Sequence, residues 1–160
     1  MHPSKIDLPE TSRTKVTRLL NERLSDAIDL GAQTKHAHWN VKGPSFIALH
    51  ELFDKVAENV EEHIDELAER ITALGGTAHG TIAHAARSSS LKPYPEDITE
   101  GMAHVRALST ALADFGAKVR QSIDATGSYG DAGTADLLTG ISRDVDKHLW
   151  LLEAHLQTER

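Results

Sequence analysis

The segment Ser45–Leu74 reads SFIALHELFDKVAENVEEHIDELAERITAL and sets the architecture expected for the whole chain. Its apolar residues recur every three or four positions, which is the spacing of one helix face. Ser45 can cap the start of such a helix, and Gly75 and Gly76 end it. At about 1.5 Å per residue, the segment predicts a rod of about 45 Å. The apolar positions are Leu49, Leu52, Phe53, Val56, Val60, Ile64, Leu67 and Ile71.

Three further segments carry the same periodicity. They run from about Ser12 to Val41, from about Asp97 to Ala125 and from about Thr134 to Thr158. No stretch alternates with period two for long enough to make a strand. The chain is therefore expected to be all-α, a four-helix bundle that forms a single domain over residues 1–160, with residues 1–11 as a short N-terminal tail.

The connections between the segments restrict the topology. Lys42–Pro44 is a short turn, so the first two helices are antiparallel neighbours, and Thr126–Gly133 joins the last two in the same way. About twenty residues, Gly76–Glu96, separate the second helix from the third, which is enough to run the length of the bundle. Thr81–Ala86 is expected to form a short helix there. The prediction is a ferritin-like bundle with one long crossover that carries a short helix.

The composition excludes several kinds of site and partner. The 160 residues contain no cysteine, which excludes disulfides, thiolate metal sites and a cysteine nucleophile. Lys and Arg total 17 against 24 Asp and Glu, and the formal charge of −7 argues against a generic nucleic-acid binder. No apolar run approaches the ~18 residues of a membrane span, and Met1–Asp7 lacks the features of a secretory signal. The expected location is the cytoplasm, with no membrane partner.

The chain contains 10 histidines, which raises the hypothesis of a metal site. Four potential ligands fall within an arc of about 100° on the helix expected at Ser45–Leu74. Each pair spaced four residues apart can bind one ion. The two pairs cannot share an ion within one chain, because Asp54 and Asp65 lie roughly 16 Å apart along the axis. The four residues are His50, Asp54, Asp65 and Glu69.

A two-fold dimer would resolve this separation. Two copies of the helix, packed antiparallel about an axis near Asn59 and Val60, would bring pairs from different chains together. His38 precedes the Lys42–Pro44 turn by about as many residues as His50 follows it, so the hairpin should bring the two imidazoles together. Two neutral nitrogens with three carboxylates suit iron(II) or another borderline divalent ion better than calcium or a structural zinc. The inferred site takes His38, His50 and Asp54 from one chain and Asp65 and Glu69 from its partner. The alternative is that these acids are merely solvated and the histidines merely packed.

A continuous motif surrounds these residues. The run TKHAHWNVKGPSFIALHELFD over Thr34–Asp54, with DELAER over Asp65–Arg70, resembles the signature of the Dps mini-ferritins, the starvation-induced DNA-protection proteins. Further similarity lies in Leu91–Pro95, Thr134–Asp136 and Ser142–Lys147, and the likeness covers nearly the whole chain from Leu8 onward. The resemblance implies a hollow homododecamer with ferroxidase sites at its two-fold interfaces. There, iron(II) is oxidised, preferentially by hydrogen peroxide, and the product is stored as a ferric mineral.

The resemblance also implies roles for particular residues. The family's ferroxidase ligands carry over onto the same five residues that the helix geometry selects: His38, His50, Asp54, Asp65 and Glu69. Iron is the metal implied, with a second iron or a zinc ion nearby as a further occupant. Trp39 is placed near the site, either as an electron-donating neighbour or as an interface anchor. The chain departs from larger di-iron bundles in lacking their Glu-x-x-His pattern.

Three acids resemble those that line the family's three-fold iron-entry pores: Asp131, Asp136 and Asp144. A ring of carboxylates would draw cations inward, but an Asp at a helix start is equally explained by capping. Asp136 is the best pore candidate. Outside these sets, His148 is interpreted as a hydrogen-bonded core or interface residue, and His63 as a solvated or interface residue off the ligand face.

Two functions remain open at this point. One is an iron-oxidising storage protein that protects against oxidative damage, and the other is an architectural protein that compacts DNA in the nucleoid. DNA binding needs basic surface, yet the first 18 residues carry four basic and two acidic residues, a net charge of only +2. Direct DNA binding is therefore expected to be weak. A manganese- or zinc-binding shell without oxidase activity is a third alternative.

Overall fold

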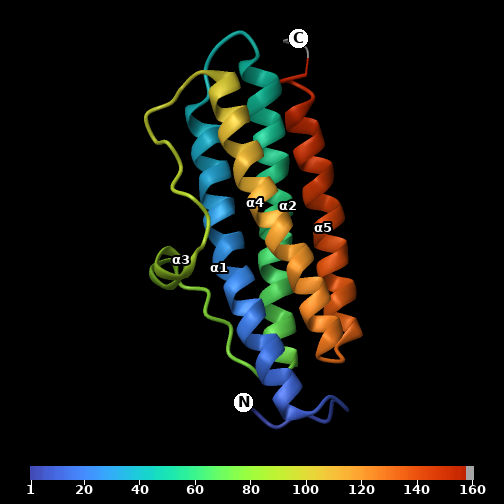
Figure 1. The fold of residues 1–160 in the computed structure, drawn as a ribbon. Coiled ribbons are helices and arrows are strands. Elements are labelled where there is room, and N and C mark those ends of the chain that lie inside the picture. Colours follow the sequence, from blue (N-terminus) through green and yellow to red (C-terminus); the bar gives the residue numbers. More distant parts are fainter. Residues whose placement is uncertain (158–160) are drawn as a thin grey trace.

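Five α-helices make up the described part of the computed structural model, which is residues 1–157. Four of them are long and lie side by side as a bundle, and the short α3 lies on the outside of α1 (Figure 1). The described residues form no strand, which confirms the expected all-α bundle. The helices are α1 (Glu10–Asn40), α2 (Phe46–Ala73), α3 (Ile82–Ser88), α4 (Gly101–Ser128) and α5 (Ala132–Glu153).

The topology is the expected one, with a single long crossover. The helices α1 and α2 form one antiparallel pair, α4 and α5 form the other, and the segment between α2 and α4 runs along α1 (Figure 1). The backbone N–H of Lys42, in the turn after α1, donates to the carbonyl of Thr99 at 2.8 Å. The start of α4 therefore lies beside the turn between α1 and α2, at the opposite end of the bundle from the end of α2.

The start of α4 corrects one expected boundary. The sequence predicts a helix from about Asp97, but α4 begins at Gly101. The carboxylate of Glu100 accepts hydrogen bonds from the backbone N–H groups of Met102 and Ala103, at 2.8 and 2.7 Å, so Glu100 caps the helix. Glu100 itself is extended, and the carbonyl of the preceding Thr99 is bonded to the first hairpin.

The other helix starts differ from expectation by at most two residues, whereas α4 ends at Ser128 rather than at Ala125. The first two long helices agree with expectation to within about two residues, which is the usual uncertainty of a helix end. The short helix α3 starts after Thr81, whose hydroxyl accepts from the N–H of His84, and it continues to Ser88 rather than Ala86. The helix α5 begins at Ala132 and ends at Glu153, earlier than expected, and the expected end itself, Thr158, lies outside the described residues.

Aliphatic side chains and two phenylalanines from the four long helices form the core. Each fully buried Leu, Ile or Phe contributes about 1.5–3 kcal/mol relative to an exposed position. None of the helices in residues 1–157 combines the length and the apolarity needed to cross a membrane. The largest side chains with less than 2% exposure are Phe53, Phe115, Leu20, Leu24, Leu30, Leu49, Leu67, Ile71, Leu74, Leu108, Leu112 and Leu138.

Buried polar contacts fasten the crossover to the bundle. Asp26 on α1 is 1% exposed, and its carboxylate accepts from the N–H and the hydroxyl of Ser90 at 2.7 and 2.9 Å. The other oxygen accepts from Arg23 Nε at 3.1 Å. Further along the crossover, the Tyr94 hydroxyl lies 2.6 Å from Nδ1 of the buried His104 on α4. These contacts explain why the crossover, about twenty residues without a long helix, stays in one position along α1.

We predict that Asp26→Ala lowers the free energy of unfolding by about 3–5 kcal/mol, because it leaves the Arg23 guanidinium buried without its main partner. Urea unfolding followed by circular dichroism, at one fixed protein concentration, measures the change. Asp124→Ala, at an exposed position of α4, is the matched control. A loss for Asp26→Ala no larger than that of the control would contradict the anchoring role.

Candidate metal centre

His38 and His50 stack against each other where α1 and α2 meet. Their ring centroids are 3.7 Å apart, and the ring planes are inclined by 20°. Each Nδ1 lies 2.8 Å from the backbone carbonyl oxygen of the other residue. A carbonyl can only accept, so each neutral ring donates its Nδ1–H and keeps a lone pair on Nε2. Metal-binding histidines are commonly oriented in this way, by a hydrogen bond on the ring nitrogen that does not bind the metal.

Asp54 lies beside this histidine pair and is held by Lys35. The Lys35 Nζ is 2.6 Å from Asp54 Oδ1, and the His38 Nδ1 is 3.9 Å from the same oxygen. The hydrogen bond from Lys35 is the main cause of a lowered pKa at Asp54, so this group is an ionised carboxylate. Lys35 was not expected here, although it precedes His38 by three residues, a spacing that puts both on one helix face.

Asp65 and Glu69 lie one turn apart on exposed positions of α2. Eleven residues separate Asp54 from Asp65, which is roughly 16 Å along a helix. Within residues 1–157 of one chain, no three His, Cys, Asp or Glu side chains form a group able to hold a metal ion. One chain thus brings the two histidines and Asp54 together and leaves the other two acids apart from them.

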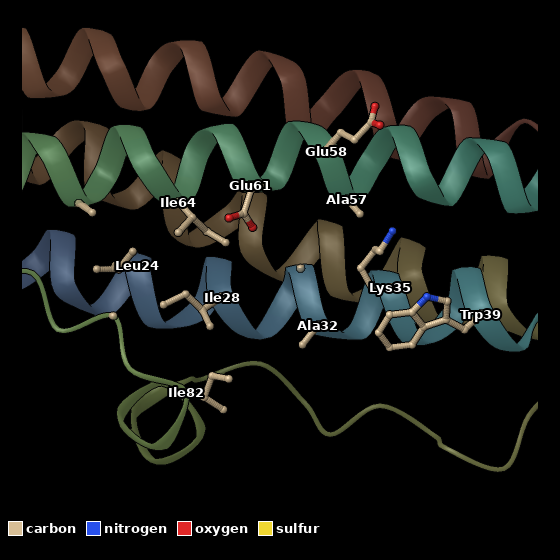
Figure 2. Close-up of a pocket in the computed structure, with 13 residues that line it drawn as sticks. Leu24, Ile28, Ala32, Lys35, Trp39, Ala57, Glu58, Glu61, Ile64 and Ile82 are labelled. Atoms are coloured by element: carbon tan, nitrogen blue, oxygen red, sulfur yellow. The ribbon is translucent and has the colours of Figure 1, made fainter.

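An open groove of about 830 Å³ runs between α1 and α2, and Lys35 lines it. Figure 2 shows Glu61 and Ile64 of α2 facing α1, with Ile82 of α3 on the other side of α1. Trp39 and Ile82 also line the groove, yet they are 69% and 83% exposed. Large apolar side chains left exposed around one groove mark an interaction surface.

The comparisons with known proteins agree with this architecture. The ferritin-like domain family matches residues 17–160. The chain is 45% identical to the DNA protection during starvation protein of Agrobacterium fabrum, over 98% of this chain and 96% of that protein. The chain belongs to the Dps family of ferritin-like proteins.

Solved structures of Dps proteins have the same fold as this chain. Mycobacterium smegmatis Dps matches with a TM-score of 0.93 at 32% identity, covering 98% of this chain and 89% of that one. The Dps protein from Vibrio cholerae O1, described as a member of a broad superfamily of ferritin-like diiron-carboxylate proteins, matches with a TM-score of 0.91 at 28% identity. That match covers 98% of both chains.

The three acids compared with Dps pores lie in different surroundings. Asp131 is 2% exposed and caps α5: it accepts from the N–H of Thr134 at 2.9 Å and from Arg70 of α2 at 2.8 Å. The capping interpretation therefore accounts for this residue. Asp136 is exposed, whereas Asp144 is half-buried and its Oδ2 lies 3.5 Å from His63 Nε2.

Two further histidines of this Dps chain lie between α2 and α5. His63 is 4% exposed in the single chain, so its interpretation as a solvated residue is wrong. The spacing of His63 and Glu66, one helical turn apart, was the signal available in the sequence, and their side chains are 3.0 Å apart. His148 is partly buried, and its Nε2 lies 3.0 Å from the Asn59 side-chain oxygen, in agreement with a hydrogen-bonded core residue.

We predict that Lys35→Gln raises the pKa of Asp54 toward the usual value for an aspartate, because it removes both the hydrogen bond and the charge that favour the ionised form. The side-chain carboxyl ¹³C shift of Asp54, followed against pH in labelled protein, measures the change. Lys55→Gln, at an exposed position of α2, should leave the curve in place. An Asp54 curve that coincides in the Lys35→Gln variant and the unmodified chain would contradict the role given to Lys35.

Proposed function

We propose that this Dps chain is a ferroxidase that oxidises iron(II), preferably with hydrogen peroxide, and stores the ferric product inside a homododecameric shell. The stacked histidine pair carries the proposal. Each ring keeps an Nε2 lone pair, fixed by the hydrogen bond on its other nitrogen, and the ionised Asp54 carboxylate lies next to the pair, 3.9 Å from His38 Nδ1. Nitrogen and oxygen donors of this kind suit iron(II). The description of the Vibrio cholerae relative as a diiron-carboxylate protein supports iron as the substrate.

The proposed site is completed by a second chain. Asp65 and Glu69 lie too far along α2 to join His38, His50 and Asp54 of their own chain, but an antiparallel α2 about a two-fold axis would bring them there. The groove between α1 and α2 supports this arrangement, because a second copy would cover Trp39 and Ile82. The two-fold operation would generate two equivalent sites per dimer, with room for a second iron or a zinc ion at each.

The ligand set suits the chemistry of the reaction. Carboxylates favour the harder ferric ion and so lower the iron reduction potential, while the imidazoles fix the geometry. In the proposed overall reaction, two iron(II) ions and two protons reduce one hydrogen peroxide to two waters and leave two iron(III) ions. Since both electrons reach the peroxide together, no hydroxyl radical is released. This outcome would protect nearby macromolecules from oxidative damage.

Other residues have supporting parts in the proposal. Trp39 follows His38 directly and lines the groove, where it would act as an electron-donating neighbour or as an interface anchor. We also propose that Asp131, Asp136 and Asp144 line an iron-entry pore at the three-fold axis of the shell. This proposal rests chiefly on Asp136, because Asp131 is engaged with Arg70 and Thr134 and Asp144 faces His63. In the cell, the shell is proposed to work in the cytoplasm.

We predict that His50→Ala and Asp65→Ala each abolish most rapid iron oxidation, because each removes one ligand from every site. Mixed assemblies of the two variants should regain up to about a quarter of the activity: half of randomly formed dimers are mixed, and one of their two sites keeps all its ligands. The measurement is near-ultraviolet absorbance after a peroxide pulse to protein loaded anaerobically with iron(II). His155→Ala, in the turn that follows α5, should retain full activity.

Mixed dimers verified by mass spectrometry that recover no activity would contradict a site shared between two chains. Loss of activity in both single variants would not then support a shared site. A site within one chain also predicts that loss. Absence of peroxide-driven oxidation in the unmodified assembly would instead support a manganese- or zinc-binding shell without oxidase activity.

DNA compaction is the second candidate function, and the name of the Agrobacterium relative favours it. The charges of this chain oppose it. Twelve subunits of −7 each would carry about −84 formally, which disfavours contact with phosphates. Arg13, one of the few basic residues near the N-terminus, is 6% exposed and donates to the carbonyls of Leu8 and Leu74. We therefore propose that DNA is protected mainly by removal of iron and peroxide.

We predict no mobility shift of linear DNA by the assembled protein at neutral pH and moderate salt, because electrostatic repulsion dominates. Lowering the pH should allow a shift, since the many histidines then become charged. Retarded DNA at neutral pH, abolished by added salt, would make compaction the primary function.

A further inference from the structure

The crossover places a tyrosine hydroxyl against a buried histidine of α4. The Tyr94 hydroxyl lies 2.6 Å from His104 Nδ1. His104 is fully buried, and Tyr94 is partly buried against the core. The two ring planes are inclined by only 17°, with the ring centroids 6.0 Å apart. The pair helps to hold the crossover in place, and it also brings a donor and an acceptor of one proton to hydrogen-bond distance.

The hydrogen bond runs from the phenol to the imidazole. Within residues 1–157, the Tyr94 hydroxyl has no other hydrogen-bond partner, so its O–H is directed at His104 Nδ1. Burial is the main cause of a lowered pKa at His104, and the nearby His36 lowers this pKa further, so the His104 ring is neutral at pH 7. A neutral ring has a lone pair on one nitrogen, and here Nδ1 carries it.

This geometry suits the loss of one electron from the phenol. Burial raises the pKa of Tyr94, so the phenol keeps its proton in the resting protein. An oxidised phenol, in contrast, is a strong acid, and its proton passes to a base within hydrogen-bond reach. The backbone of Ile98 and the Glu100 carboxylate both act to raise the pKa of His104, so they stabilise the arriving proton. Tyr94 can therefore be oxidised without leaving a positive charge on its own ring.

We propose that Tyr94 and His104 form a redox-active pair that quenches strong one-electron oxidants. Tyr94 gives one electron to the oxidant, and its O–H bond breaks as the proton passes to His104 Nδ1. A hydroxyl radical is one such oxidant: it takes the electron and a proton from solvent and becomes water. The tyrosyl radical returns to tyrosine when a reductant such as iron(II) supplies one electron and His104 returns the proton. The iron(II) ion becomes iron(III).

A route through side chains leads from Tyr94 toward the proposed iron site. The rings of Tyr94 and His36 meet edge to face, with their centroids 5.4 Å apart. Trp39 follows His36 by three residues on α1, which is the spacing of neighbours on a helix surface. An indole radical at Trp39 would take one electron from Tyr94 and one proton from solvent. The pair would thereby quench radicals that form at the iron site, and this role alone rests on the proposed function.

Pulse radiolysis of the metal-free assembled protein tests the pair without iron. Azidyl radicals remove one electron from tryptophan or tyrosine, and absorbance then follows the tyrosyl radical. The chain has two tyrosines, Tyr94 and Tyr129. Tyr94→Phe should remove most of the tyrosyl signal, whereas Tyr129→Phe, the matched control, should keep it. Tyr129 is the poorer electron donor, because Lys15 Nζ lies 5.3 Å from its ring centroid and a positive charge there opposes oxidation.

Two further measurements separate proton transfer from a structural role. In the His104→Gln variant, the amide can accept the hydrogen bond but not the proton, so the tyrosyl radical should form about 100-fold more slowly. High-field electron paramagnetic resonance of the unmodified protein needs no variant. The largest g value of the radical should be lowered by a hydrogen bond to its oxygen, and the coupling of that proton should disappear in deuterium oxide.

Equal tyrosyl yields from the unmodified and Tyr94→Phe proteins would overturn the proposal. A radical without a hydrogen bond to its oxygen, or equal rates in the unmodified and His104→Gln proteins, would also overturn it, because His104 would then take no proton. Since radiolysis uses no iron, failure here leaves the ferroxidase proposal standing. Absence of iron oxidation would likewise leave this result unchanged.

Discussion

The two hydrogen bonds exchanged between His38 and His50 are the interaction on which the rest of the site depends. Each ring donates to the backbone carbonyl of the other residue, so the ring positions and the register of α1 against α2 are fixed together. A slip of either helix would break both bonds and separate the stacked rings. The same hairpin sets the groove between α1 and α2 and the position of Asp54. The placement of His38, His50 and Asp54 therefore follows from one contact region.

Much of this arrangement could be predicted from sequence because local rules apply. The spacing of apolar residues predicts the long helices. The short Lys42–Pro44 turn predicts that α1 and α2 pair and that His38 and His50, on either side of the turn, meet. The misplaced start of α4 has a tertiary cause: Thr99 is bonded to the first hairpin, and Glu100 then caps the helix. The ion pair of Lys35 with Asp54 and the burial of His63 depend on contacts between helices. The spacing of residues along one helix does not predict such contacts.

The proposed iron site is incomplete in a single chain. It has three proposed ligands at the hairpin and two exposed acids elsewhere on α2, so assembly with a second chain would control its formation. Under this proposal, iron oxidation depends on assembly of the chains.

The most direct test of the shared site is anomalous diffraction at the iron edge from crystals of the assembled protein loaded anaerobically with iron(II). The account predicts iron at the two-fold interface, bound by His38, His50 and Asp54 of one chain and by Asp65 and Glu69 of the partner subunit. Iron bound at this position only by residues of a single chain, or iron absent from the two-fold interface, would contradict it.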